Sequence, residues 1–404
     1  MNFLNVDIPV KNVPELDKGF VPLGLFFKHY EKGAAKPLCI AVERSGGQIG
    51  TWECKVHGTP DMAEADAYYV DRLVKFLLWS WGGFKVYICG DDKLADIDDD
   101  KCISCGACMK ACPFGAISDR AQILNVINEF KAGRQVIAMF APALEGEFGA
   151  GVPVAKLKKA LEQLGFEKAY EVGLGADAVA MAEAEELLEH LKAGLKMTTS
   201  CCPAFVNMIR KHFPRLQANV STTVSPMVAL SRWVREKYPQ AKVVFIGPCV
   251  AKKTEQVEGG PDYVLTTEEI VAMMDARKID PDKMEADPVQ ESSTYGKGFA
   301  SSGGVTSAVM QVIQEMGEVP QVSAQRCNGA AECKKALMML QAGKFDMDFI
   351  EGMACEGGCM YGPGNLLNER LYTQARKKFL GEADDRGVIE NAKEQGFDQI
   401  HMHR

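Results

Sequence analysis

Short apolar runs alternate with amphipathic stretches between residues 133 and 375. The runs "QVIAMF", "KAYEV" and "KVVFIG" have the length and composition of buried strands. The stretches "VAKLKKALEQLGF" and "MVALSRWVREKY" repeat apolar residues three and four positions apart, as one face of a helix requires. Strands that alternate with helices predict an α/β fold with mainly parallel sheets.

Three further segments complete the predicted organisation. Residues 1–99 hold three strand-like runs, "PLCIAVER", "IGTWECKVHG" and "FKVYICG", with a helical run between the second and third. They predict a small α/β unit, to which the pattern assigns no role. The acidic stretch "DDKLADIDDD" predicts a polar hinge before a cysteine-rich segment at residues 100–132. Residues 376–404 are expected to form a helical tail.

The composition narrows the class of protein. The chain has 404 residues, a net charge of −8 and no basic tract, so we expect neither nucleic-acid nor membrane binding. The first twenty residues lack a secretory pattern, and the longest apolar run is broken by Gly82, Gly83 and Lys85. We therefore expect a cytoplasmic protein. Fourteen cysteines in a reducing compartment predict metal or redox chemistry instead of disulfides.

One short run, "CISCGACMKACPFGAI", has the C-x2-C-x2-C-x3-C-P spacing of bacterial ferredoxins. Its four cysteines are Cys102, Cys105, Cys108 and Cys112. The spacing predicts a [4Fe–4S] cluster, with a structural zinc site as the alternative. In a second alternative Cys89 supplies the fourth ligand and Cys112 joins Cys39 and Cys54 around a second cluster. We favour one regular cluster, with Cys39, Cys54 and Cys89 as buried strand residues.

Three distant segments, "TSCCPAFV", "IGPCVAKKTE" and "EGMACEGGCMYGPG", supply another set of cysteines. They are Cys201, Cys202, Cys249, Cys355 and Cys359. Each segment follows an apolar strand-like run, so we expect the cysteines to meet at one edge of the sheet region. A [4Fe–4S] cubane takes four thiolates, which leaves one of these five without a ligand role.

The three segments, in this order, resemble the TSCCP, PCxxKKxE and ExMACxGGC motifs of the [FeFe]-hydrogenases. The resemblance covers roughly residues 100–375 and implies a two-lobed catalytic domain at residues 133–375. It implies an H-cluster, which is a cubane joined to a two-iron subcluster with CO, cyanide and dithiolate ligands. The cubane ligands would be Cys202, Cys249, Cys355 and Cys359. The thiolate of Cys359 would also bridge to the two-iron subcluster.

The resemblance also implies a proton path. Cys201 would carry protons to and from the dithiolate, and the path would continue through Glu183, Ser221 and Glu186 to water. Glu183 and Glu186 are three residues apart, so they share one helix face. The alternatives are an inert buried cysteine and a solvated, glutamate-rich helix face.

Other segments would enclose the two-iron subcluster. Lys252 would donate a hydrogen bond to a cyanide ligand, and we expect Lys253 to lie in solvent. The segments "FAPALEG" and "FASSGGVTSAVM" and the third cysteine motif supply the residues expected to line the cofactor: Pro142, Ala143, Gly303, Gly304 and Met353. The chain departs from the main family pattern at Gly247, where methionine is usual, and at Glu356, where proline is usual.

The expected activity is the reversible interconversion of protons and electrons with H2. Electrons would pass through the accessory [4Fe–4S] cluster to ferredoxin or a similar low-potential carrier, and hydrogenase maturation enzymes would assemble the cofactor. Two alternatives stay open. One is a regulatory protein that binds the same cofactor and senses H2, and the other is an iron–sulfur assembly protein of the Nar-like branch without the two-iron subcluster.

Overall fold

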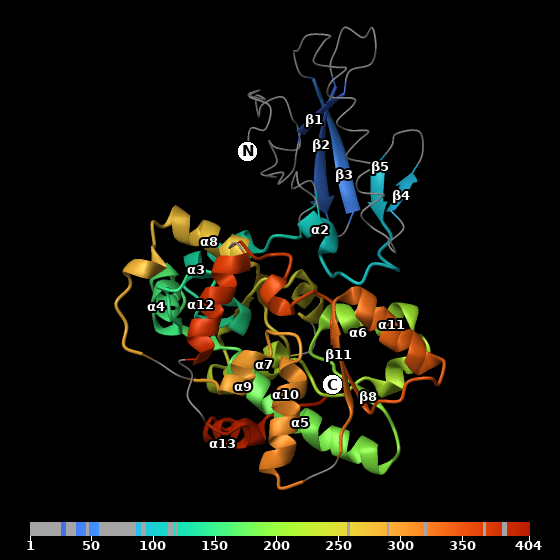
Figure 1. Ribbon diagram of the computed structural model, residues 1–404. Coiled ribbons are helices and arrows are strands. Elements are labelled where there is room, and N and C mark those ends of the chain that lie inside the picture. Colours follow the sequence, from blue (N-terminus) through green and yellow to red (C-terminus); the bar gives the residue numbers. More distant parts are fainter. Residues whose placement is uncertain are drawn as a thin grey trace. The chain divides into compact units, whose positions relative to one another are not determined.

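The computed structural model describes residues 26–29, 38–45, 48–55, 86–89, 94–111, 117, 119–256, 259–288, 291–318, 321–366, 369–381 and 386–404 (Figure 1). The chain divides into two compact units, Met1–Cys102 with Gly106–Arg120, and Ile103–Cys105 with Ala121–Arg404. The boundaries expected near residues 99, 132 and 375 stay predictions. Cys112 and the helix expected before "FKVYICG" lie outside the described residues.

The first unit contains two antiparallel groups of strands. The strands β1 (Phe26–His29), β2 (Leu38–Ser45) and β3 (Gln48–Lys55) form one sheet, and β4 (Val86–Cys89) pairs with β5 (Leu94–Ile97). The helix α2 (Ala107–Ala111) follows. The expected strands β2, β3 and β4 are confirmed. The polar-hinge prediction was wrong at Leu94–Ile97, because these residues pair with β4 as a strand. In the β2–β3 ladder, Cys39 stands directly opposite Cys54.

Two parallel sheets form the framework of the second unit. The first has the order β10-β9-β6-β7, from the strands β6 (Val136–Phe140), β7 (Lys168–Glu171), β9 (Lys242–Ile246) and β10 (Tyr263–Leu265). The second has the order β11-β12-β8, from β8 (Met197–Thr198), β11 (Ala324–Asn328) and β12 (Phe349–Met353). Helices lie between the strands along the chain, so the predicted α/β fold with mainly parallel sheets is confirmed.

Helices and short 3₁₀ turns connect these strands. The helices are α3 (Ile123–Lys131), α4 (Val154–Leu164), α5 (Gly173–Lys192), α6 (Pro203–His212), α7 (Pro226–Lys237), α8 (Thr267–Ala276), α9 (Thr294–Gly298), α10 (Gly304–Glu315), α11 (Ala330–Gln341), α12 (Glu369–Gly381) and α13 (Val388–Glu394). The 3₁₀ turns are η3 (Pro142–Leu144), η4 (Pro214–Asn219), η5 (Val250–Glu255), η6 (Pro281–Lys283), η7 (Cys359–Tyr361) and η8 (Phe397–Gln399). Among the described residues, no helix has the length and apolarity that crossing a membrane requires.

The strand β6 shows why its residues form a buried parallel strand. All five of its residues are buried, and they alternate between two hydrophobic clusters. Ile137 and Met139 belong to the cluster built with α5 and α7, whereas Val136 and Ala138 belong to the cluster built with α4. Because both faces of the strand are covered, its sequence is a continuous apolar run.

The helix α5 is the central helix of the second unit and packs against α7, α10 and α13. Its first half is rich in glycine and alanine, which lets neighbouring backbone approach closely. A Cβ atom at Gly175 would lie 2.3 Å from the carbonyl oxygen of Pro226 at the start of α7. The buried position of α5 places Glu183 and Glu186 inside the protein.

A third hydrophobic cluster lies around α6 and α11. Phe205 and Ile209 of α6 pack with Leu337 of α11 and Ile350 of β12. Each large apolar side chain that is fully buried contributes about 1.5–3 kcal/mol. This cluster anchors the two helices against the second sheet, next to the segments that carry the predicted cysteine motifs.

Candidate metal centre

The carboxyl ends of strands from both sheets deliver the five cysteines of the second set. The strand β8 leads to Cys201 and Cys202, and β12 leads to Cys355 and Cys359. The strand β9, which belongs to the other sheet, leads to Cys249. We expected the cysteines to meet at one edge of the sheet region. The structure adds that this region comprises two parallel sheets, whose strand ends face one cavity.

The cavity has a volume of about 70 Å³. Four of the five cysteines line it: Cys201, Cys202, Cys249 and Cys359. Cys355 does not line the cavity, but the charges of Cys249, Cys202 and Cys359 all raise the pKa of its thiol, so it lies within their electrostatic reach. The structure thus gathers all five cysteines around one place.

The arrangement suits a multi-iron cluster. In a cubane each cysteine binds a different iron, so the four sulfur atoms are spread around the cage. A set of cysteines that surrounds a common space without converging on one point fits that requirement.

Burial is the first cause of the high thiol pKa values, and neighbouring cysteines add to it. Burial and then Cys202 raise the pKa of Cys249 to about 11, although Lys252 and two backbone N–H groups act in the opposite direction. The pKa of Cys359 is raised by burial and then by Cys249 and Cys202. These two thiols are therefore protonated at neutral pH without metal, and binding of iron would release their protons.

The two adjacent cysteines occupy different surroundings. Cys201 is buried in the cluster around α5 and α7, whereas Cys202 packs against the cluster around α6 and α11 and is the N-cap residue of α6. The pKa of the Cys201 thiol is raised by burial first and by Glu183 second. Although Cys201 and Cys202 are adjacent in the sequence, they therefore pack against different parts of the core.

Lys252 lies beside these thiols at the wall of the cavity. Its Nζ donates hydrogen bonds to Glu255 Oε2 at 2.7 Å and to the carbonyl oxygen of Cys201 at 3.0 Å. Burial lowers the pKa of Lys252, but Glu255 and Cys249 outweigh this effect and the net pKa is raised. Lys253 does not lie in solvent as expected, because its Nζ is 3.1 Å from Glu269 Oε2 and both side chains are largely buried.

Of the five residues expected to line a cofactor, Pro142, Ala143 and Met353 line the cavity. Gly303 and Gly304 are not among the lining residues. They start α10 instead, where the N–H of Gly303 donates to Glu351 Oε1 at 2.7 Å. Phe299 and Ala300, a few residues before these glycines, line the cavity instead.

The missing side chain at Gly247 leaves space for two residues that line the cavity. A Cβ atom there would lie 2.9 Å from both the Cβ of Ala141 and the ring of Phe245, and both of these residues line the cavity. The absence of a side chain at Gly247 therefore lets Phe245 occupy the wall.

The predicted carboxylates lie in one buried region. Glu183 Oε1 accepts a hydrogen bond from the N–H of Ser200 at 3.2 Å, while its Oε2 has no partner among the described residues. Ser221 Oγ donates to Glu186 Oε2 at 2.6 Å. The charges of Cys201 and Glu186 both interact with Glu183, so these residues are neighbours.

The two glutamates have opposite pKa shifts. Burial raises the pKa of Glu183 to about 8, and its few hydrogen bonds do not compensate. Burial also acts on Glu186, but hydrogen bonds from Ser221, Thr222 and Thr223 outweigh it, so its pKa is lowered. At neutral pH Glu183 is mostly protonated and Glu186 is ionised. Sequence reasoning missed Thr222 and Thr223, although they directly follow the predicted Ser221.

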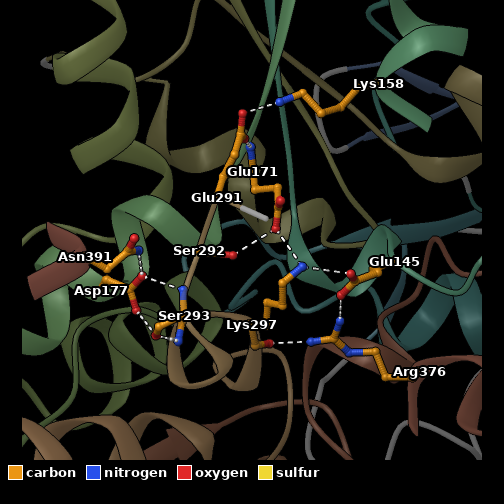
Figure 2. A network of polar contacts seen from close by, with 11 residues as sticks. Glu145, Lys158, Glu171, Asp177, Glu291, Ser292, Ser293, Lys297, Arg376 and Asn391 are labelled. Carbon is orange, nitrogen blue, oxygen red and sulfur yellow. Dashed lines mark hydrogen bonds and ion pairs between the residues drawn. The ribbon is translucent and has the colours of Figure 1, made fainter. Parts of the chain in front are cut away.

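A buried network of charges joins segments that neighbour residues lining the cavity (Figure 2). Lys297 Nζ is 2.9 Å from Glu145 Oε1 and 2.8 Å from Glu171 Oε2. Arg376 of α12 pairs with Glu145 and donates to the carbonyl oxygen of Lys297. Ser292 Oγ donates to Glu171 Oε2 at 2.8 Å. Two cations thus balance two carboxylates with almost no exposure to solvent.

The network ties together the segments that form the wall. Glu145, Glu171 and Lys297 each stand within three residues of residues that line the cavity. Beside them, Asp177 accepts hydrogen bonds from Ser293 and Asn391, yet burial raises its pKa to about 6. No local sequence signal indicated this network, because its members come from remote segments.

The ferredoxin-like segment contains two residues with left-handed backbone conformation. Ser104 and Gly106 have positive φ values of 60° and 71°. Cys105 packs against the same hydrophobic cluster as Cys202 and Cys249. Cys102 and Cys108 belong to the other compact unit, and Cys112 lies outside the described residues.

Comparisons with known proteins agree with these motifs. The family model "Iron only hydrogenase large subunit, C-terminal domain" matches residues 134–363, and "4Fe-4S binding domain" matches residues 95–118. The chain is 30% identical over 377 residues to Iron hydrogenase 1 of Clostridium pasteurianum, a match that covers 69% of this chain and 66% of that protein. It thus spans about two thirds of that relative's length.

A more distant relative and a solved structure are also similar to this chain. The chain is 22% identical over 342 residues to the nuclear prelamin A recognition factor of Homo sapiens, which covers 67% of this chain and 75% of that protein. Its fold is similar to that of a variant of the apo [FeFe]-hydrogenase from Chlamydomonas reinhardtii, with a TM-score of 0.58 and 22% identity. That match covers 70% of this chain and 98% of the other.

The buried network gives a prediction for stability. Replacing Lys297 by methionine leaves the carboxylates of Glu145 and Glu171 undercompensated, and breaking a buried pair in this way costs about 3–5 kcal/mol. We expect a clearly lower denaturant midpoint for Lys297→Met. Lys159→Met is the control, because Lys159 pairs with Glu162 at the surface. Equal midpoints for the two variants would contradict the structural role of Lys297.

The raised pKa of Glu183 gives a prediction for pH dependence. The folded protein holds the Glu183 proton up to about pH 8, whereas an unfolded chain releases it near pH 4.5. Glu183 therefore makes the fold progressively less stable as pH rises from about 4.5 to 8. Glu183→Gln should remove this loss, which is on the order of 3–5 kcal/mol.

The measurement is the free energy of unfolding of both proteins at several pH values across this window. The advantage of Glu183→Gln should grow with pH and level off above pH 8. Glu185→Gln is the matched control on the same helix, because Glu185 is exposed. A difference between Glu183→Gln and the unmodified chain that stays constant with pH would show that Glu183 is ionised in the folded state.

Proposed function

Because the chain belongs to the iron-only hydrogenase family, we propose that it is an [FeFe]-hydrogenase that interconverts protons and electrons with H2. The observation that carries this proposal is the gathering of five thiols from three remote segments beside one buried cavity. Four of these thiols match the ligands of a cubane, and the fifth matches a proton carrier.

The residues present fit the H-cluster. Cys202, Cys249, Cys355 and Cys359 would hold the cubane, with Cys359 also facing the cavity that would receive the two-iron subcluster. When bound, this group supplies the iron centre at which H2 is formed or split. The apolar residues Pro142, Ala143, Phe299 and Met353 would exclude water from it.

The protein's own side chains would then move protons. The Cys201 thiol stands at the cavity, and Glu183 next to it holds a proton in a buried site at neutral pH. Ser221 is already hydrogen-bonded to Glu186. No hydrogen bond joins Glu183 to Ser221 in the described part of the chain, so that transfer needs a hydroxyl rotation or a bridging water.

Lys252 would have a positioning role. Its ammonium group is held by Glu255 and by the carbonyl oxygen of Cys201, which leaves one N–H for an anionic ligand in the cavity. A cyanide ligand would satisfy that N–H. Pro142 and Ala143 lie on the wall formed by η3, where the carbonyl oxygen of Ala143 accepts a hydrogen bond from Tyr372 at 2.6 Å.

Electrons would enter through an accessory [4Fe–4S] cluster held by Cys102, Cys105, Cys108 and Cys112. Cys105 supports this route, because its charge contributes to the raised pKa of Cys355 and it packs in the cluster that also touches Cys202. Ferredoxin or a similar low-potential carrier would be the external partner, and maturation enzymes would supply the two-iron subcluster. We place this chemistry in the cytoplasm.

A second candidate function is iron–sulfur assembly without the two-iron subcluster. The similarity to the nuclear prelamin A recognition factor favours it. The retention of Cys201 and Lys252 beside a buried cavity favours the hydrogenase, because a scaffold for a cubane alone needs neither. A regulatory protein that senses H2 would keep the same site and turn over slowly.

One experiment separates these functions. The chain is produced without oxygen together with hydrogenase maturation enzymes, and its infrared spectrum and hydrogen turnover are measured. We expect the bands of iron-bound CO and cyanide together with turnover. Bands with negligible turnover would identify a sensor, and full iron–sulfur loading without bands would identify an assembly protein.

Variants of the paired cysteines test the division of roles. Cys201→Ala should keep the CO and cyanide bands and lose at least about 100-fold in turnover, because a proton carrier is missing. Cys202→Ala should lose the bands as well, because a cubane ligand is missing. An active Cys201→Ala protein would exclude the thiol of Cys201 as the proton carrier.

A further inference from the structure

Residues 400–404 pair with the stretch that follows Ser221. Thr223 and His403 form an antiparallel bridge, in which the N–H of Val224 donates to Met402 at 2.8 Å and the N–H of Arg404 donates to Thr222 at 2.9 Å. Nη1 of Arg232 on α7 also donates to the carbonyl oxygen of His403 at 3.0 Å. These bonds hold the His403 ring beside Thr222.

Thr222 connects this ring with the buried glutamate. Its backbone N–H donates to Glu186 Oε1 at 2.8 Å, so Thr222 lies in direct contact with that carboxylate. Its Oγ1 lies 2.9 Å from Nδ1 of His403. Glu186 is only 8% exposed, whereas Thr222 and His403 are both exposed. Thr222 thus contacts both groups, the buried carboxylate through its backbone N–H and the imidazole in solvent through its hydroxyl.

The chemistry of the three groups suits proton exchange with water. Glu186 accepts hydrogen bonds from donors that favour its ionised form, so its protonated form is unfavourable. A second group that exchanges protons with solvent would therefore help. A hydroxyl group donates and accepts at the same time. An imidazole gains and loses protons in the neutral pH range and exchanges them with buffer.

We propose that His403 is the solvent-side proton donor and acceptor of this protein, acting through the Thr222 hydroxyl on Glu186. This inference rests on the proposed function and extends its proton path beyond Glu186. In one direction, Nδ1 of His403 gives a proton to Thr222 Oγ1, and the Thr222 hydroxyl proton passes to Glu186 after rotation of the hydroxyl or through a bridging water. Each transfer breaks one bond to hydrogen and forms another, so Thr222 keeps no net charge.

Other charged groups face the same place. The ring centroid of His401 is 6.1 Å from that of His403, and Arg232 contacts the carbonyl oxygen of His401. Arg404 donates to the carbonyl oxygen of Ser200 at 3.2 Å and lies 3.9 Å from Glu255. Of the two histidines, it is His403 that contacts Thr222. His401 is therefore the matched control.

Chemical rescue tests the proposal on the loaded protein. His403→Gln keeps a side chain of similar polarity that cannot carry a proton at neutral pH. In weak buffer we expect hydrogen turnover to fall at least about 5-fold, and added imidazole should restore most of it. His401→Gln should behave as the unmodified chain. A His403→Gln protein with unchanged turnover in weak buffer, or a loss that imidazole does not repair, would overturn the proposal.

A second measurement does not depend on activity. The protein is labelled with isotopes in its histidines, and the protonation of each ring is followed by NMR in the unmodified chain and in Glu186→Gln. Removing the Glu186 charge should shift the titration of His403 by more than that of His401. Equal shifts would overturn the proposal even if the chain is not a hydrogenase, whereas a selective shift without turnover would point to failure of the proposed function.

Discussion

The site depends on holding several sulfur atoms together in a place that opposes their ionisation. Burial raises the thiol pKa values of Cys249, Cys355 and Cys359, and repulsion from neighbouring cysteines, Cys202 in each case, raises them further. The polypeptide holds these cysteines next to the strand ends of two parallel sheets. Iron would remove the conflict, since it replaces protons by a positively charged cage.

Near the cavity the protein holds buried charges in two different ways. In the network of Figure 2, Lys297 and Arg376 balance Glu145 and Glu171. On the side of Cys201, Glu183 has no cation and one oxygen without a partner among the described residues. The first arrangement fixes geometry, because each charged side chain has a partner of opposite charge. The second leaves a carboxyl group whose proton can move.

The sequence predicted those features that local spacing determines. The strands before "TSCCP", "GPC" and "MACEGGC" and the shared helix face of Glu183 and Glu186 follow from short-range patterns. Ion pairs between residues far apart in the sequence leave no such local pattern. Lys253 finds its partner in Glu269 of α8, and Lys297 finds Glu145 and Glu171 in two other segments.

The strand β5 is another feature that the local sequence did not predict. Its acidic neighbours suggested a hinge, but a strand at Leu94–Ile97 forms because β4 offers a hydrogen-bonding edge. Likewise, the meeting of two sheets at the cavity could not be read from strand order along the chain, since strand order does not say which strands share a sheet. Gly303 and Gly304 were expected at the cavity, but the constraint on Gly304 is the carbonyl oxygen of Gly298, 1.9 Å from where a Cβ would stand.

The start of η5 has an electronic consequence. Burial raises the pKa of the Cys249 thiol, while the Lys252 ammonium group and the backbone N–H groups of Lys252 and Ala251 favour its thiolate form. Donors of this kind withdraw electron density from a metal-bound sulfur and favour the more negative oxidation level of a cluster. A cluster held at Cys249 would therefore be easier to reduce because of η5, a turn of only six residues.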